Sequence, residues 1–431
     1  MQITFSNFTF YYKIKMIRLK KLIFCVFVVY ITDIQFIYSQ IDAEYIKTVV
    51  LRSESANSFA PIFKLGEPFS LSFDDVQGDE KEYHYKIEHF DYDWSKSKIS
   101  PNEFVIGFNQ NRIRDYENSF NTLQYYTHYN ISFPNEKTQI VLSGNYLISV
   151  LNEFDEVVFS RKFVVVNPKA EVGVTIHRTR SIETITEKQT VQFVVNHANL
   201  VINNPSQEIK VVVMQNNNWN TALVNLPPQY FKSGQLVYKY DKETSFWGGN
   251  EFLNFDNKII RNTSLNIRNI YLGDDIFYTH LFTNEERSKV PYTYFPDING
   301  NFVVRNLEGE NPNIDADYTW IHFYLKTENI LTDKDIYVYG NFNNWQISTE
   351  NKMKFNNRTK LYELPILLKQ GFYNYKYVTV DQRNNLNDYE IDGSFYQTEN
   401  EYTVLVYYRK MGTRYDEVIG VGNVNSEIIS P

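Results

Sequence analysis

The sequence predicts an all-β protein built from three tandem immunoglobulin-like β-sandwich domains. Short runs rich in β-branched and aromatic residues recur along the chain, among them EYHYKIEHF, VVFSRKFVVV, TVQFVVNHANL and DIYVYGNF. Turn-forming stretches such as DDVQGDE, NNPSQ and PDINGN separate these runs at the spacing typical of sandwiches. No segment with helical periodicity and capping residues competes with the strands.

We expect residues 1–40 to be a secretory signal peptide. Five basic residues come first, an apolar run over 22–31 follows, and the segment ends in the polar sequence IYSQ. Met16 stands directly before IRLKK and is a second candidate for the start of translation. The single cysteine, Cys25, lies inside the apolar run, so we expect neither a lipid anchor nor disulfides in the mature chain.

The charge balance of the chain after residue 40 argues against nucleic acid as a partner. Removal of residues 1–40 leaves 38 basic and 50 acidic residues, a net charge of −12, whereas nucleic-acid-binding proteins carry a basic surface. No later apolar run reaches the roughly 20 residues that a membrane-spanning helix needs. The length allows two to four domains of about 100–200 residues each.

Two polar, proline-containing stretches indicate the domain limits. Asn167-Pro168 follows an apolar strand, and NLEGENPN occupies the region between residues 306 and 312. The predicted parts are an N-terminal sandwich over 41–167, a second sandwich over 168–308, a third over 309–410 and a C-terminal tail over 411–431.

The residues that could carry chemistry do not form a site at the level of sequence. His84 and His89 would lie on opposite faces of one strand, because successive side chains alternate and their separation is odd. Asp91 and Asp93 would share a face, but two carboxylates fall far short of the roughly six to eight oxygens that Ca²⁺ takes. We therefore expect a solvated strand end beside Trp94.

Signatures of catalysis are missing as well. The chain has no G-x-S-x-G nucleophile elbow and no glycine-rich phosphate loop. Adjacent acidic pairs such as Glu285-Glu286 and Asp274-Asp275 are typical of solvated loops rather than of two carboxylates set across a cleft. The sequence predicts no enzyme, no cofactor, no bound metal and no small-molecule substrate.

Two segments are candidates for contact with a protein partner. The segment from Ile99 to Asn121 has aromatic residues without a period of two, as expected for a long connection between strands. Its candidate contact residues are Phe104, Phe108, Arg112 and Tyr116. The second segment, 247–258, combines Trp247 with Gly248-Gly249, which permit unusual backbone angles. For both segments the alternative is packing within the protein itself.

The third predicted domain resembles the early-set immunoglobulin-like modules that bind glycogen. The resemblance rests on IYVYGNFNNW and LPILLKQGFYNYKYVTVD. It implies sugar contacts at Trp345 and Lys376, and hence a periplasmic glucan-binding protein as the alternative function. Where such modules carry a second sugar-stacking tryptophan, this chain has QRNNLNDYEIDG, which favours the packing of Trp345 at a hairpin edge.

A wider resemblance covers most of the chain. YKIEHFDYDW, GFNQNRIRDYENSFNT, YTHYNISFPN and LSGNYLISV, with later matches at WGGNEFLNFD and DGSFYQTENEYTVLVYYR, resemble the plug protein family of the Bacteroidetes type IX secretion system. The first-domain match runs over residues 45–305. The resemblance implies a non-enzymatic protein at the periplasmic face of the outer membrane. Its partner would be the outer-membrane translocon barrel, whose inner mouth it closes while no substrate is in transit.

A third interpretation of the strand-rich sequence, beside a plug protein and a glucan-binding protein, is an outer-membrane β-barrel. Such a barrel needs regular strands of about ten residues with alternating lipid-facing apolar positions. The irregular strand lengths and the proline-containing linkers of this chain argue against it.

Overall fold

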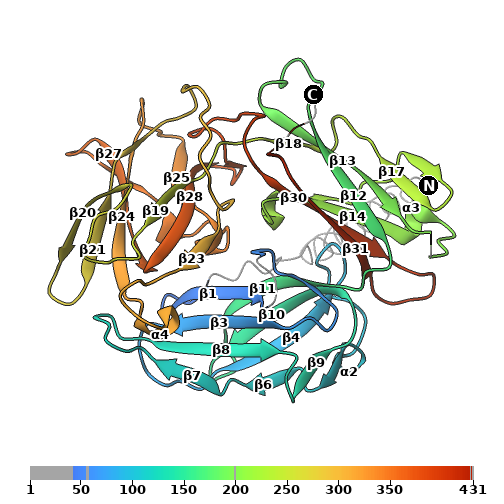
Figure 1. Ribbon diagram of the computed structural model, residues 1–431, viewed down its shortest axis with the longest axis horizontal. Helices are drawn as coiled ribbons and strands as arrows, with labels where there is room; N and C mark the ends of the chain where they lie inside the picture. Colours follow the sequence, from blue (N-terminus) through green and yellow to red (C-terminus); the bar gives the residue numbers. More distant parts are fainter. Residues whose placement is uncertain (1–41, 55–57, 199, 428, 430–431) are drawn as a thin grey trace, which may run out of the picture. The chain divides into compact units, whose positions relative to one another are not determined.

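The computed structural model describes residues 42–54, 58–198, 200–427 and 429 (Figure 1). The predicted signal peptide over 1–40, with Met16 and Cys25, lies outside these residues. Among the described residues, strands make up 47% and helices 5%, and the strands form β-sandwiches. The all-β prediction is therefore confirmed.

The first sandwich packs an antiparallel sheet face to face on a mixed sheet. One sheet has the order β1-β3-β8-β7, and the other has the order β2-β11-β10-β4-β6 with β2 parallel to β11. The strands of the first sheet are β1 (Ile46–Ser53), β3 (Phe69–Asp75), β8 (Thr127–Phe133) and β7 (Asp115–Asn118). Those of the second are β2 (Ile62–Lys64), β11 (Val157–Val166), β10 (Gly144–Leu151), β4 (His84–Phe90) and β6 (Gln110–Arg112). A helical turn, α2 (Pro101–Phe104), leads into the small sheet of β5 (Val105–Gly107) and β9 (Thr138–Ile140).

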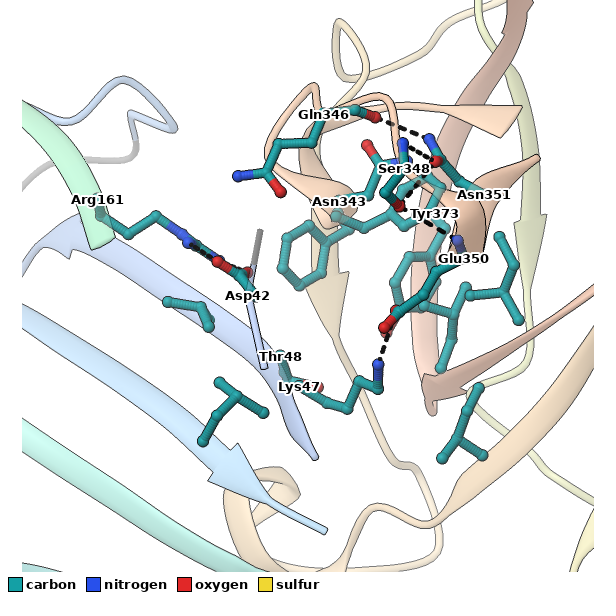
Figure 2. Close-up of a pocket in the computed structure, with 17 residues that line it drawn as sticks. Asp42, Lys47, Thr48, Arg161, Asn343, Gln346, Ser348, Glu350, Asn351 and Tyr373 are labelled. Atoms are coloured by element: carbon teal, nitrogen blue, oxygen red, sulfur yellow. Dashed lines mark hydrogen bonds and ion pairs between the residues drawn. The ribbon is translucent and has the colours of Figure 1, made fainter. Parts of the chain in front are cut away.

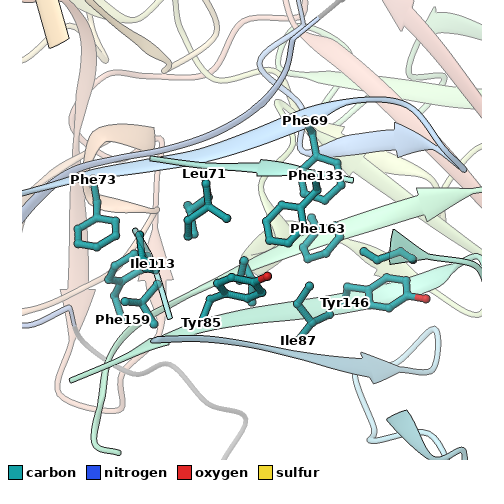
Figure 3. Close-up of a cluster of buried hydrophobic side chains, with 14 of the residues drawn as sticks. Phe69, Leu71, Phe73, Tyr85, Ile87, Ile113, Phe133, Tyr146, Phe159 and Phe163 are labelled. Atoms are coloured by element: carbon teal, nitrogen blue, oxygen red, sulfur yellow. The ribbon is translucent and has the colours of Figure 1, made fainter. Parts of the chain in front are cut away.

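Aromatic side chains fill the space between these two sheets (Figure 3). On β3 the side chains of Phe69, Leu71 and Phe73 point inward, while the residues between them are partly exposed. The Phe69 ring stacks on Phe63 with centroids 4.3 Å apart. Each fully buried Phe or Leu side chain contributes about 1.5–3 kcal/mol relative to an exposed one. Alternation along the strand thus produces the core of this sandwich.

The second sandwich combines strands from the middle and from the end of the chain. Its first sheet contains β12 (Glu171–Arg178), β13 (Lys188–Asn196), β17 (Gln235–Tyr238), β16 (Tyr230–Lys232) and β18 (Ser245–Trp247). Its second sheet contains β15 (Leu223–Val224), β14 (Ile209–Gln215), β30 (Glu401–Tyr408) and β31 (Glu417–Asn425). The short helical turns α3 (Pro205–Glu208) and η1 (Trp219–Thr221) flank β14. In Figure 1 the red strands β30 and β31 lie among the green strands.

The third sandwich holds the remaining strands. One sheet contains β19 (Leu253–Asp256), β28 (Gly371–Asp381), β23 (Phe302–Val304), β25 (Lys334–Tyr339) and β29 (Leu386–Asn387). The other contains β20 (Ile267–Leu272), β21 (Phe277–Leu281), β24 (Tyr318–Lys326), β27 (Leu361–Lys369), β26 (Lys354–Asn356) and β22 (Asn284–Glu285). The turns α4 (Pro312–Asp315), η2 (Asn341–Asn343) and η3 (Thr349–Asn351) connect them.

Strand pairing crosses the predicted domain limits in both the second and the third sandwich. Strand β30 pairs with β14 from Gln215↔Tyr402 to Ile209↔Tyr408, although the sequence-based limits assign β30 to the third domain. Strands β19 and β23, which precede residue 308, both pair with β28. The segment from 411 onward, predicted as a tail, contains β31. The domain limits themselves stay a prediction.

The first and second sandwiches pack together through an apolar layer. Every residue of β10 is buried, and so are seven consecutive residues of β30, because both faces of these strands are covered. Val164, Val212, Leu405 and Tyr407 belong to the shared cluster. Within this layer the Tyr407 hydroxyl donates to Asn145 Oδ1 at 2.7 Å.

A buried ionic network connects the first and third sandwiches. The Lys369 ammonium of β27 lies 2.7 Å from Asp74 Oδ2 of β3, and the Tyr318 hydroxyl donates to the same oxygen at 2.6 Å. His128 Nδ1 lies 2.6 Å from the other oxygen of Asp74. Lys369 also lies over the Tyr126 ring at 4.1 Å from its centroid. Both oxygens of the Asp74 carboxylate therefore accept hydrogen bonds, and the Lys369 ammonium contacts both this carboxylate and the Tyr126 ring.

Candidate protein-contact surfaces

Among the residues that the structure describes, the histidines and aspartates of the β4 region do not gather into a group that could hold a metal ion. His89 is buried and His84 is partly exposed, so their predicted placement on opposite faces of β4 is confirmed. The prediction of a solvated strand end is wrong for Asp91, which is 8% exposed. Its Oδ2 lies 2.5 Å from Arg409 Nη2, and its Oδ1 accepts the Asp416 amide N–H at 3.1 Å. Asp93 instead accepts hydrogen bonds from Ser95.

The segment from Ile99 to Asn121 is more regular than a long connection. It contains α2, β5, β6 and β7, each paired with or leading into a neighbouring strand. Phe104 is 3% exposed and packs with its ring centroid 5.9 Å from that of Tyr146. Its side chain is therefore part of the first core.

The other three candidate residues of this segment lie on the surface. Phe108 is 68% exposed and Tyr116 is 38% exposed, with the Tyr116 hydroxyl donating to Glu80 at 3.2 Å. Arg112 lies on β6, where it pairs with Glu82 at 3.2 Å. Arg112 and Tyr116 belong to different sheets of the sandwich. The candidates are therefore distributed over the first sandwich rather than gathered at one point.

Trp247 is half-buried at the end of β18. Its ring stacks on Tyr389 with centroids 4.2 Å apart, and the Lys188 ammonium lies 4.3 Å above it. Gly249 has φ +66°, so the predicted unusual backbone at this glycine pair is present. A Cβ at Gly248 would approach the Phe395 carbonyl oxygen to 2.0 Å. Close packing of this turn holds the tryptophan in place.

Trp345 and Lys376 are both engaged inside the protein. Trp345 is 7% exposed, with its ring centroid 5.1 Å from that of Tyr339, and its carbonyl oxygen accepts a hydrogen bond from Asn220 at 2.8 Å. The Lys376 ammonium lies 2.6 Å from Asp388 Oδ2. The Trp345 ring therefore offers no open face on which a sugar could stack, and the Lys376 ammonium is already paired with Asp388.

Five rings on the outer face of the third sandwich form a surface that the sequence reasoning missed. We call it the ring ladder; its members are Tyr271, Tyr278, His280, His322 and Tyr324, from β20, β21 and β24. His280 and His322 stack with centroids 4.3 Å apart, and the Tyr271 and Tyr278 rings lie 5.1 Å apart. Tyr271 at the edge is 47% exposed.

The two histidines of the ring ladder, His280 and His322, are uncharged near pH 7. Burial, followed by the neighbouring His280, lowers the pKa of His322 to about 4. Burial and Arg268 lower the pKa of His280. A signal for this surface exists in the sequence, since FYTHL and YTWIHFYLK place a ring at every second position on the face opposite the core.

A small cleft separates the first sandwich from η2 and η3 of the third (Figure 2). The Lys47 ammonium reaches Glu350 at 3.0 Å, while Arg161 binds Asp42 with two hydrogen bonds of 2.8 and 2.6 Å. The cleft has a volume of about 80 Å³, well below the ~300–1,000 Å³ of small-molecule pockets. The polar groups that line the cleft pair with one another, and the Lys47–Glu350 pair joins the first sandwich to the third.

The fold and these surfaces define a class of protein, a multi-sandwich β protein with aromatic rings on its exterior. Among the described residues, no helix has the length and apolar character that crossing a membrane requires. The family model for the type 9 secretion system plug protein first domain matches residues 46–167.

One solved structure is similar to this chain and is matched along nearly the whole of its own length. It is a hypothetical protein from Parabacteroides merdae, 33% identical, with a TM-score of 0.86; the match covers 89% of this chain and 98% of that one. A serine-rich repeat protein from Streptococcus agalactiae, at 9% identity and a TM-score of 0.12, carries no argument. No curated protein matches the sequence. The chain belongs to the type 9 secretion system plug protein family, whose role is that of a plug associated with the secretion machinery in the cell envelope.

Proposed function

We propose that this protein closes the periplasmic mouth of the outer-membrane translocon barrel of type IX secretion while no substrate is in transit. It does so by occlusion, without a catalytic step and without a cofactor. Its partner is the barrel protein, and its place is the periplasmic face of the outer membrane. The family match over residues 46–167 supports the general role.

The observation that carries the occlusion mechanism is the buried connection between sandwiches. A plug must keep its shape against a pore, and residues 41–431 group into one compact unit. The Asp74–Lys369 pair joins the first sandwich to the third, and the Arg409–Asp91 pair joins the second to the first. The Asp74–Lys369 pair is almost completely buried, whereas Arg409 is 40% exposed, so the first pair is the one that requires the two sandwiches to keep a defined position relative to each other.

The ring ladder is the contact surface we assign to the barrel, together with exposed residues Phe108 and Tyr116 of the first sandwich. A plug must seal the pore and still be released, which calls for aromatic anchors inside a polar rim rather than a large apolar interface. Aromatic residues dominate the binding energy of such interfaces. Neutral His280 and His322 suit this role because burying them against a partner removes no charge from water.

The proposal is tested in cells that lack the gene and carry it back on a plasmid. The translocon barrel is affinity-purified, and the uptake of a large hydrophilic antibiotic such as vancomycin is measured. We expect the protein to co-purify with the barrel and the deletion strain to admit the antibiotic. A barrel that never retains the protein, or a deletion strain as impermeable as the parent, would refute occlusion.

A matched pair of variants tests the contact surface. Tyr271→Ser removes an exposed ring of the ring ladder, and Tyr230→Ser removes a ring that is 57% exposed on β16 of the second sandwich. We expect Tyr271→Ser to weaken binding to the barrel about 5- to 30-fold, the effect of losing ~1–2 kcal/mol of contact energy. Tyr230→Ser should behave as the wild type. Equal retention of both variants would remove the ring ladder from the interface.

A further inference from the structure

We propose that Glu251, Asp297 and Glu399 bind a calcium ion where the third sandwich meets strand β30. One ligand oxygen from each of these three carboxylates lies within 4.8 Å of the others. Ca²⁺ binds carboxylate and amide oxygens at about 2.3–2.6 Å, so two ligands on opposite sides of the ion are roughly 4.8 Å apart. The arrangement has the dimensions and the donor type of a calcium shell.

An unpaired buried oxygen points independently to a ligand. Glu251 is 0% exposed, and its Oε2 has no hydrogen-bond partner among the described residues. Its Oε1 accepts from the Tyr292 hydroxyl and from the Glu399 amide N–H. A buried carboxylate oxygen without a partner costs the full desolvation penalty of that group, and the penalty is largest when the group is charged. A bound cation removes this penalty.

Asn299 supplies a further oxygen beside the cluster. Its Oδ1 is buried and unpaired in the described structure, while its Nδ2 donates to both oxygens of Glu399 at 3.2 Å. Its backbone N–H donates to Asp297 at 2.6 Å. The asparagine thus holds two of the three carboxylates in place and leaves a neutral oxygen for the ion's shell.

Within the described residues, none of the three carboxylates forms an ion pair with Lys, Arg or His. The guanidinium of Arg287 binds Asp392 at 2.9 Å and the Glu251 carbonyl oxygen at 2.9 Å. A divalent cation would compensate the charge of the three carboxylates, and an all-protein oxygen shell suits Ca²⁺ better than Mg²⁺, which keeps several waters.

The position of the three residues gives the ion a structural consequence. Glu251 precedes β19, Asp297 precedes β23, and both strands pair with β28 of the third sandwich. Glu399 precedes β30, which pairs with β14 of the second. Calcium at this point would connect two sandwiches through their loops, so the stiffness of the junction would depend on the calcium concentration.

The experiment uses the purified full-length mature protein in two measurements. First, Tb³⁺, which replaces Ca²⁺, is added and its emission is recorded with excitation of tyrosine, since Tyr292 contacts Glu251. We expect sensitised emission that Ca²⁺ displaces. Second, thermal unfolding is followed in EDTA and in Ca²⁺, where we expect Tm to rise by about 5 °C at a concentration roughly 100-fold above the Kd.

Variants separate a bound ion from a general salt effect. Glu251→Gln and, should it fail to fold, Asp297→Asn should lose both the Tb³⁺ emission and the Ca²⁺-dependent rise in Tm. In EDTA the same variants should be at least as stable as the wild type, because they relieve repulsion between carboxylates. Glu285→Gln, at an exposed carboxylate paired with Lys326, is the control and should respond as the wild type. Equal Tm shifts in Glu251→Gln and the wild type, or no Tb³⁺ emission from the wild type, would overturn the site without bearing on occlusion.

Discussion

Asp74 and Lys369 form an ion pair of 2.7 Å, although 295 residues separate them in the chain. Both side chains are almost completely buried, at 0% and 1% exposure. Burial alone would raise the pKa of Asp74, but Lys369 and His128 outweigh it and hold the pKa below its usual value. Burial lowers the pKa of Lys369, and Asp74 acts against this shift. The pair couples the first sandwich to the third.

Removal of one partner of this pair is expected to destabilise the protein strongly. Asp74→Ala leaves the Lys369 ammonium buried without its counter-charge and should lower the free energy of unfolding by about 3–5 kcal/mol. Urea unfolding at neutral pH measures the change. The double variant Asp74→Ala with Lys369→Met should recover much of the loss, because it removes the uncompensated charge. A double variant no more stable than Asp74→Ala would contradict this account.

Stability should fall in mild acid because of His89. Burial lowers its pKa to about 4, against which the Ser143 carbonyl and Asp91 act only weakly. The folded protein therefore holds His89 neutral while the unfolded chain binds a proton below about pH 6.5. Keeping His89 neutral therefore contributes its full share to the free energy of unfolding above about pH 6.5. As the pH falls from about 6.5 to about 4, this contribution is lost, and the free energy of unfolding decreases by up to about 3 kcal/mol.

The variant His89→Gln isolates this effect from the titration of carboxylates, which it shares with the wild type. Urea midpoints of both proteins are compared at about pH 7 and about pH 5. We expect the wild type to lose more stability than His89→Gln over that interval. Parallel losses would show that His89 does not drive the pH dependence.

Phe104 and Phe108, four positions apart, should respond to substitution in opposite ways. Phe104→Ala opens a cavity in the first core and should cost about 3–5 kcal/mol of stability. Phe108→Ala should leave stability within about 0.5 kcal/mol, since its ring is 68% exposed, and should weaken co-purification with the translocon. Phe154→Ala, at a ring that is 73% exposed elsewhere on the sandwich, is the control. If Phe108→Ala retains the barrel as well as Phe154→Ala does, Phe108 is not a contact residue.

Trp345→Ala should act on stability rather than on sugar binding. The ring packs against Phe252 and Tyr339, so its removal should lower the free energy of unfolding by about 3–5 kcal/mol. Retention of the wild type and the variant on immobilised glucan is measured in parallel with urea unfolding. Strong retention of the wild type that disappears in an equally stable variant would instead support the glucan-binding alternative.

Prediction from sequence succeeds for features that depend on a single strand, such as which of its side chains face the core. The alternation in β4 places Tyr85, Ile87 and His89 inward, and the aromatic composition predicts a core of stacked rings. It fails for Asp91, whose partner Arg409 comes from the distant strand region after β30. It also fails for Phe104, because an irregular spacing of aromatics does not reveal the short turn α2 that buries it.

The sequence by itself determined the all-β class, the alternation of faces along each strand and the membership of the plug family. Only the tertiary structure decided that β30 joins β14, that Asp74 meets Lys369, and that Glu251, Asp297 and Glu399 converge. The physical reason is that a strand's pattern specifies which of its faces must be buried, whereas the identity of the covering sheet depends on the summed packing of all strands. Sites made from loops of different sandwiches exist only once that packing is complete.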